Sequence, residues 1–121
     1  MLKKTITFTD FNGVERTEDF YFNLTKAEVA IMETSTAGGW GEHLRTIVAE
    51  QDPKKIVDAF RYLIAKAYGK KSPDGRQFLK SQEILDSFEQ TEAYSELFME
   101  LVTNPEAPAA FVNGIFPQIP T

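Results

Sequence analysis

The sequence of 121 residues contains no cysteine, and it has only one histidine and one tryptophan. Without cysteine, disulfides, thiolate catalysis and cysteine-ligated zinc are excluded. Lysine and arginine are outnumbered by aspartate and glutamate, with a net charge of 13 − 18 = −5, so binding of nucleic acid through a generally positive surface is not expected. No apolar run approaches the roughly 18 residues that span a bilayer, and the start of the chain lacks the apolar stretch of a signal peptide. We therefore expect a soluble, cytoplasmic protein with no membrane or nucleic-acid partner.

The length is that of one domain. A hydrophobic content of 42% is enough for the chain to fold without disulfides or other cross-links. We expect a single α+β domain over residues 1–116, followed by a flexible C-terminal tail at 117–121. An N-terminal β-hairpin is expected at about 3–23 and a bundle of about five to six α-helices at about 25–115. This order, a strand pair and then only helices, is typical of segregated α+β folds and not of βαβ units.

The hairpin is predicted from two short segments on either side of an Asn-Gly pair. Thr5–Thr9 alternates polar and apolar residues, and Asp19–Phe22 is rich in aromatic residues. If the numbers of paired residues sum to 26, Ile6 lies opposite Phe20 and the apolar side chains share one face of the hairpin. This register predicts a three-residue loop, Asn12–Val14, or a bulge.

Helix starts are marked by capping residues that precede apolar residues at helical spacing. Thr25 and Glu28 form a capping box, which predicts a helix to about Thr34. Asp52-Pro53 begins the clearest amphipathic helix, which we expect to end at Gly69 before a basic loop. A second helix is expected at about 42–50, separated from the first by Ser35–Gly39. Three more helices are expected after the capping residues Ser81, Thr91 and Asn104, and Gly114 is expected to end the last of them.

No arrangement of residues typical of an active site is present. His43 has no accompanying nucleophile or metal-ligand pattern, so we interpret it as a surface or helix-end residue. Gly38–Gly41 follows a helix, whereas phosphate-binding loops follow a strand. An enzyme would have to rely on a carboxylate pair such as Asp86 and Glu89 alone. We therefore predict a protein that is not an enzyme and holds no cofactor or metal.

Charge is unevenly distributed along the chain. Residues 66–80 carry five bases and one acid, 5 − 1 = +4, whereas residues 81–102 carry six acids and no base, −6. Glu92, Glu96 and Glu100 recur every four residues and therefore share one helix face, where they repel each other. They are either a solvated face or an acidic ridge that docks a basic or amphipathic helical partner.

Apolar residues supply the other candidates for partner binding. Trp40 either fills the core or forms a contact from a loop. Phe111, Ile115 and Phe116 lie in a C-terminal region whose only charged residue is Glu106, and they either pack on the core or form an exposed patch. The complete set of candidate partner-binding residues is Glu92, Glu96, Glu100, Phe111, Ile115, Phe116 and Trp40.

Four stretches of the sequence together resemble one family. Thr5–Thr25 is similar to the opening of small tail assembly chaperones from long-tailed bacteriophages. Ala67–Arg76, Gln90–Phe98 and Phe111–Gly114 resemble later parts of the same proteins. The resemblance extends over nearly the whole chain and includes no catalytic signature.

The resemblance implies a non-enzymatic protein made in the host bacterial cytoplasm. Such a protein would bind the long, largely helical tape measure protein, keep it soluble and promote tail tube assembly around it. Tail tube protein and a frameshifted longer form of the chaperone are further implied partners, and the chaperone is usually absent from the mature virion. An alternative is a structural virion component, such as a tail-completion or head-tail connector protein. Self-association to a homo-oligomer through the open edge of the hairpin is a further alternative.

Overall fold

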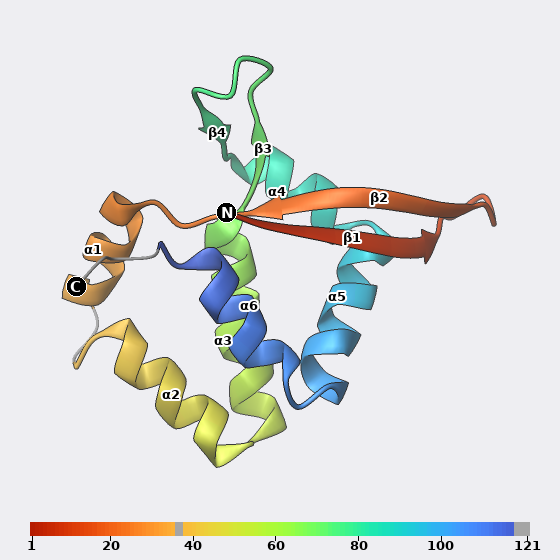
Figure 1. Ribbon diagram of the computed structural model, residues 1–121. Coiled ribbons are helices and arrows are strands. Elements are labelled where there is room, and N and C mark those ends of the chain that lie inside the picture. The colour runs from red at the N-terminus through yellow and green to blue at the C-terminus, as the bar shows by residue number, and fades with distance from the viewer. Residues whose placement is uncertain (36–37, 118–121) are drawn as a thin grey trace.

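The computed structural model describes residues 1–35 and 38–117. In these residues two long strands are followed by six helices, and a short second hairpin lies between the third and the fourth helix (Figure 1). This confirms the predicted α+β class with an N-terminal hairpin. The expected break at Ser35–Gly39 and the expected tail lie partly outside the described residues. The elements are β1 (Leu2–Thr9), β2 (Glu15–Phe22), α1 (Lys26–Ser35), α2 (Trp40–Glu50), α3 (Pro53–Ala67), β3 (Tyr68–Lys71), β4 (Phe78–Leu79), α4 (Gln82–Glu89), α5 (Glu92–Thr103) and α6 (Ala107–Ile115).

The strands form one antiparallel sheet in the order β1-β2-β3-β4. The β1–β2 ribbon has one inner and one outer face, because successive side chains point to opposite sides of a strand. On the outer face the hydroxyls of Thr7 and Thr17 are 2.9 Å apart. α5 and α6 pack against β1, and α4 packs against β3. The inner face buries Ile6, Phe8, Phe20 and Phe22.

The predicted register of the hairpin is wrong, because Ile6 lies opposite Glu18 and the paired positions sum to 24. Asp10 closes the loop, since its N–H donates to the carbonyl of Val14 at 2.8 Å. The Asp10 carboxylate also accepts the N–H of Val14 at 3.0 Å. Three residues, Phe11–Gly13, therefore lie between these positions, and the glycine has a φ of 80°. The sum of paired residue numbers is 26 in the predicted register and 24 in the observed one. Because this difference is even, the same side chains face inward in both.

The expected basic loop after α3 is instead a second hairpin, β3–β4. The helix ends at Ala67, and Gly69 lies within β3 opposite Tyr21. Tyr68 has extended backbone dihedrals, and its ring lies 5.5 Å from the Phe22 ring. Pairing with β2, about 50 residues away in the chain, favours the strand here, so local residue preferences alone do not predict it.

The capping predictions at Thr25, Asp52 and Ser81 are confirmed by side-chain hydrogen bonds, whereas the prediction at Asn104 is wrong, because α6 begins at Ala107 after Glu106. The Thr25 N–H donates to Glu28 Oε1 at 3.0 Å, and the Glu28 N–H donates to Thr25 Oγ1 at 3.2 Å. The side chains of Asp52 and Ser81 accept N–H bonds at the starts of α3 and α4. Thr91 precedes α5 as expected, but its hydroxyl donates to a carbonyl of the preceding turn. Local sequence therefore sets most helix starts.

The start of α2 and the end of α6 also differ from those expected. α2 begins at Trp40, two residues before the predicted start, and the indole is buried and stacks on Tyr62 with 4.8 Å between ring centroids. Gly114 does not end α6, which continues to Ile115. A Cβ on Gly114 would lie 2.8 Å from Leu2 Cδ1, so this glycine allows α6 to approach β1 closely.

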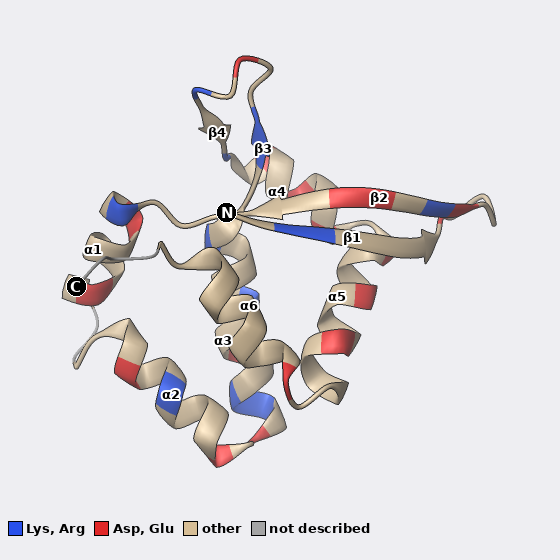
Figure 2. Cartoon of the chain, in the orientation of Figure 1, with Lys and Arg blue, Asp and Glu red and all other residues tan. Residues whose placement is uncertain are grey.

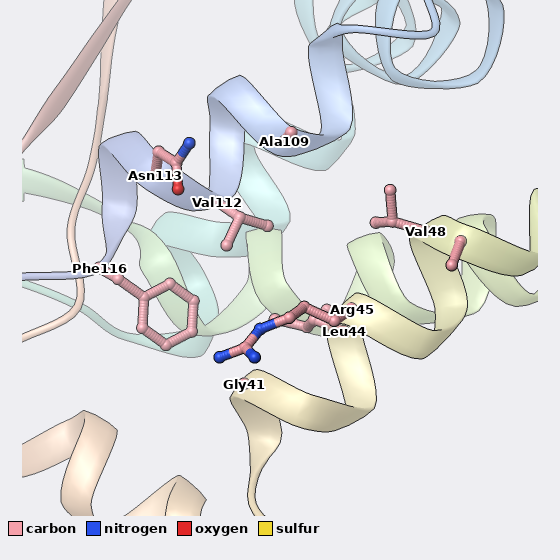
Figure 3. Close-up of a pocket in the computed structure, with 9 residues that line it drawn as sticks. Gly41, Leu44, Arg45, Val48, Ala109, Val112, Asn113 and Phe116 are labelled. Carbon is pink, nitrogen blue, oxygen red and sulfur yellow. The ribbon is translucent and has the colours of Figure 1, made fainter.

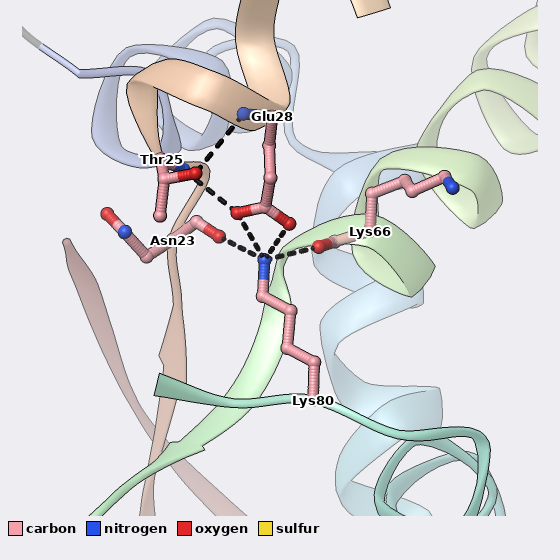
Figure 4. Close-up of polar contacts among 5 residues, drawn as sticks. All are labelled: Asn23, Thr25, Glu28, Lys66 and Lys80. Carbon is pink, nitrogen blue, oxygen red and sulfur yellow. Dashed lines mark hydrogen bonds and ion pairs between the residues drawn. The ribbon is translucent and has the colours of Figure 1, made fainter. Parts of the chain in front are cut away.

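Lys80 connects three segments near the sheet (Figure 4). Its Nζ donates to the carbonyl of Asn23 at 2.8 Å, the carbonyl of Lys66 at 2.7 Å and the Glu28 carboxylate at 2.8 and 3.0 Å. Desolvation by burial raises the pKa of Glu28, but hydrogen bonds from Lys80 and Thr25 outweigh it, so the pKa lies below its usual 4.5. The ends of β2 and α3 and the start of α1 are thereby held together.

Replacing Lys80 by methionine should lower the free energy of unfolding by about 2 kcal/mol, because a partly buried carboxylate and two carbonyls lose their donor. Lys70→Met, at an exposed position of β3, is the control and should have little effect. Folding lowers the pKa of Glu28, so the ionised carboxylate stabilises the folded state. This stabilisation is fully present above pH 4.5 and is lost as the pH falls through the pKa of the folded state. Urea unfolding should therefore show the Lys80→Met defect shrinking in acid. A defect independent of pH would contradict this assignment.

Gly69→Ala should destabilise the second hairpin. A Cβ at Gly69 would lie 2.7 Å from Phe78 Cε2 and 2.8 Å from the carbonyl oxygen of Leu79, so backbone would have to move. We expect a loss of about 2 kcal/mol in thermal or urea unfolding. The control is Gly41→Ala, whose Cβ would meet nothing closer than 3.8 Å and should raise helix stability by about 0.5 kcal/mol. Equal effects at both positions would refute the close approach.

Candidate partner-binding site

The described residues contain no arrangement that indicates catalysis. The His43 ring packs edge-on against Trp40 with 5.2 Å between centroids. Within residues 1–35 and 38–117, no group of three His, Asp or Glu residues is placed to hold a metal ion, and every buried side-chain nitrogen or oxygen has a hydrogen-bond partner. The helices in these ranges are also too short or too polar to cross a membrane.

Three of the apolar candidates are core residues. The side chains of Trp40, Phe111 and Ile115 are 8%, 3% and 0% exposed. The ring of Phe111 lies 5.4 Å from that of Phe22. Of the two alternatives for the C-terminal region, packing on the core is the one observed for Phe111 and Ile115, so these side chains do not present a surface to a partner. Phe116 is only partly buried and lies at the edge of this core.

An open apolar groove separates α2 from α6 (Figure 3). Its volume is about 430 Å³. The side chains of Val112 on α6 and of Phe116 directly after α6 point toward α2, where Leu44 and Arg45 lie (Figure 3). Arg45 is engaged by Glu42, with 2.7 Å between Nη1 and Oε1. Most of the groove surface comes from small or apolar residues, namely Gly41, Leu44, Val48, Ala49, Ala109 and Val112.

The groove exists because the apolar surface of each helix extends past the part that packs on its neighbours. α2 packs on α3, and α6 packs on α5 and β1. Val48 and Ala49 continue the apolar surface of α2 beyond its buried residues, and Ala109 and Val112 do the same on α6. An apolar hollow that is open to solvent is typical of a binding site for another protein.

A second hollow of about 250 Å³ extends the groove and shares Val48 with it. It is bordered by Ile56 at the start of α3 and by Val102 and Pro105 at the end of α5. Together the two hollows follow α2 from Gly41 to beyond its C-terminal end. The hollowed surface therefore extends over more than the 11 residues of α2, about 16 Å, and becomes more polar where Gln51, Thr103 and Asn104 line it.

The three glutamates of the predicted acidic ridge on α5 differ in their surroundings. Glu92 and Glu96 are exposed, whereas the carboxylate of Glu100 lies 2.8 Å from Lys4 Nζ of β1. Figure 2 shows acidic residues and no basic residues along α5. Two acids, and not three, thus face solvent without an ion pair in the described part of the chain, and Met99 is 58% exposed beside them.

The residues of α2 in the groove were not found by the sequence reasoning. Leu44, Ile47 and Val48 have the i, i+3, i+4 spacing of an ordinary core-facing stripe, so the sequence carries no signal of a second surface on this helix. Their opposition to α6 depends on the packing of both helices against other elements. No local pattern specifies such an arrangement.

Comparison with known proteins identifies the family. Residues 1–119 match the family model described as phage tail assembly chaperone, and the chain therefore belongs to this family. No curated protein and no solved structure matches the chain. The resemblance found in the sequence is thus confirmed at the level of the family.

The division of the C-terminal region into core and groove can be tested by truncating one phenylalanine at a time. Phe111→Ala should lower the free energy of unfolding by about 4 kcal/mol, because it leaves a cavity beside Phe22 and Phe60. Phe116→Ala should cost about 1 kcal/mol, since much of that ring already faces the groove. Urea unfolding of both variants measures the difference. Similar losses would show that Phe116 belongs to the core.

Proposed function

We propose that this chain binds the tape measure protein of its phage, keeps it soluble and promotes assembly of the tail tube around it. The observation that supports this proposal is the open apolar groove between α2 and α6, in a chain that belongs to the tail assembly chaperones. In this role the protein is non-enzymatic, acts in the host cytoplasm and is absent from the mature virion. Tail tube protein and a frameshifted longer form of the chain are further proposed partners.

The physical argument starts from the state of the tape measure protein before the tube encloses it. A long helical protein without its tube exposes apolar faces, and such faces associate with one another in water. A small protein with an apolar groove can cover these faces one segment at a time. Its net charge of −5 also disfavours association between its own copies, which helps to keep the complex in solution.

Co-expression of the N-terminally tagged chain with the tape measure protein encoded beside it tests the proposal. We expect both proteins to co-purify and the soluble fraction of the tape measure protein to rise, because its apolar segments are covered. An unrelated coiled-coil protein of similar length is the control and should not be captured. The absence of both a complex and a gain in solubility would refute the proposal. Stoichiometric presence of the chain in purified virions, measured by mass spectrometry, would instead favour a structural virion component.

A further inference from the structure

The outer edge of β2 is open over much of its length. β3 pairs with β2 at Tyr21 and Phe22 and then turns away from it (Figure 1). β1 lies on the other side of β2 and pairs with all of it. Residues Glu15–Phe20 therefore have β1 on one side and no strand of the described ranges on the other.

Alternate residues of this edge direct their backbone groups away from β1. In an antiparallel pair, positions that bond to the partner strand alternate with positions that do not. Asp10 and Val14 form a bonded pair, so the even-numbered residues of β2 bond to β1. The odd-numbered residues, among them Thr17 and Asp19, direct their N–H and C=O groups to the opposite side. Asn23 continues the odd-numbered series, and its N–H donates on that side, to the end of α3 at 2.8 Å.

Side-chain contacts agree with this alternation. The hydroxyl of Thr5 donates to the Asp19 carboxylate at 2.6 Å, and the hydroxyls of Thr7 and Thr17 are 2.9 Å apart. Opposite side chains approach most closely at pairs that exchange no backbone hydrogen bonds. The open edge of β2 thus presents, at Thr17 and Asp19, the main-chain groups with which an added strand pairs.

A hollow of about 450 Å³ lies beside this edge, and its floor is aromatic. It is lined by Phe20, Tyr68 and Phe88, and the last two rings stack with 4.3 Å between their centroids. Glu18 also borders the hollow and lies on the same face of β2 as Phe20, two residues away. Burial raises the pKa of Tyr68 and the Glu18 carboxylate raises it further, so this carboxylate lies near the phenol. The edge therefore has an apolar and an acidic feature at the spacing of alternate strand residues.

We propose that an extended segment of the tape measure protein adds to the open edge of β2 as a further strand. Its backbone pairs with Thr17 and Asp19. An aliphatic or aromatic side chain of the segment covers the rings of the hollow, and a lysine or arginine two residues along faces Glu18. The inference rests on the proposed function, because the segment belongs to the protein that this chain chaperones. It adds a second contact, separate from the groove, that selects extended backbone.

The open edge favours a strand of another protein over other occupants. A helix cannot pair with it, because helical N–H and C=O groups are already bonded within the helix. A second copy of the chain would bring a further net charge of −5 to a strand that carries Glu15, Glu18 and Asp19. Arg16 is the one base of this strand, and Asp10 holds it at 2.6 Å. A basic segment is instead attracted to these acids.

Amide hydrogen exchange of the full chain, resolved by residue with NMR, tests the open edge before any partner is added. The amides of Thr17 and Asp19 should exchange about tenfold or more faster than those of Glu18 and Phe20, which bond to β1. Equal protection of the two sets would overturn the open edge. Protection of Thr17 that rises with the concentration of the chain would show that a second copy occupies the edge, and this would overturn the choice of occupant.

Binding is measured by fluorescence anisotropy with peptides of about 10 residues that overlap along the tape measure protein, because peptides this short are not stable helices in water. The bound peptides should contain an apolar residue and a lysine or arginine two positions apart. Thr17→Pro removes an N–H from the open edge of β2 and should weaken their binding about tenfold. Thr7→Pro is the matched control, since it removes an N–H from the outer edge of β1 and loses the same contact between hydroxyls. It should leave the affinity unchanged.

Side chains at the hollow are tested by variants that leave the backbone of β2 intact. Ser87→Gln adds bulk at an exposed position of the hollow on α4 and should weaken binding about tenfold. Ser95→Gln, exposed on α5, is its control and should have no effect. Glu18→Gln should weaken binding about fivefold at low salt, whereas Glu15→Gln changes the net charge equally on the outer face and should have little effect. Normal binding by both Ser87→Gln and Glu18→Gln would overturn the role of the hollow.

The outcomes separate this inference from the proposed function. If the full tape measure protein is captured but no peptide binds, or if Thr17→Pro binds peptides as the unaltered chain does, the inference fails and the proposed function stands. If neither the full protein nor any peptide binds, the proposed function fails as well. Equal losses in Thr17→Pro and Thr7→Pro would show a general effect on the β1–β2 ribbon and would overturn the assignment to the edge of β2.

Discussion

The burial of Phe22 at the end of β2 is the contact on which the other elements depend. Its ring lies within 5.4–5.8 Å of the rings of Tyr68, Phe88 and Phe111, which come from β3, α4 and α6. These four aromatic residues are far apart in the sequence, so their packing fixes where the two hairpins and the later helices meet. Lys80 completes this junction with polar contacts that hold α1 beside it.

The groove is a consequence of this arrangement. α3 packs with α2, and α5 packs with α6, so α2 and α6 are positioned by different neighbours and leave an open apolar space between them. A folded protein rarely leaves such a surface without use, because exposed apolar area favours association. In a chain that belongs to the tail assembly chaperones, this surface is the one that we propose binds the partner.

The distribution of charge complements the apolar groove. Most acids of α2, α4 and α5 lie at the surface, and three of them are paired, with Arg45, Lys55 and Lys4. Glu92 and Glu96 are therefore the acids of α5 that stay exposed without an ion pair in the described part of the chain. Apolar contact supplies affinity in such an interface, whereas charge contributes to the rate of association and to specificity.

The sequence by itself determined the features that depend on neighbouring residues. The helix starts at Thr25, Asp52 and Ser81 follow from hydrogen bonds within one turn, and the strand alternation follows from a period of two. Tertiary structure alone decided the strand at Tyr68, the hairpin register and the division of the C-terminal apolar residues into core and groove. Each of these depends on contacts between distant segments, and a local pattern gives an apolar residue no information about which distant segment it will meet.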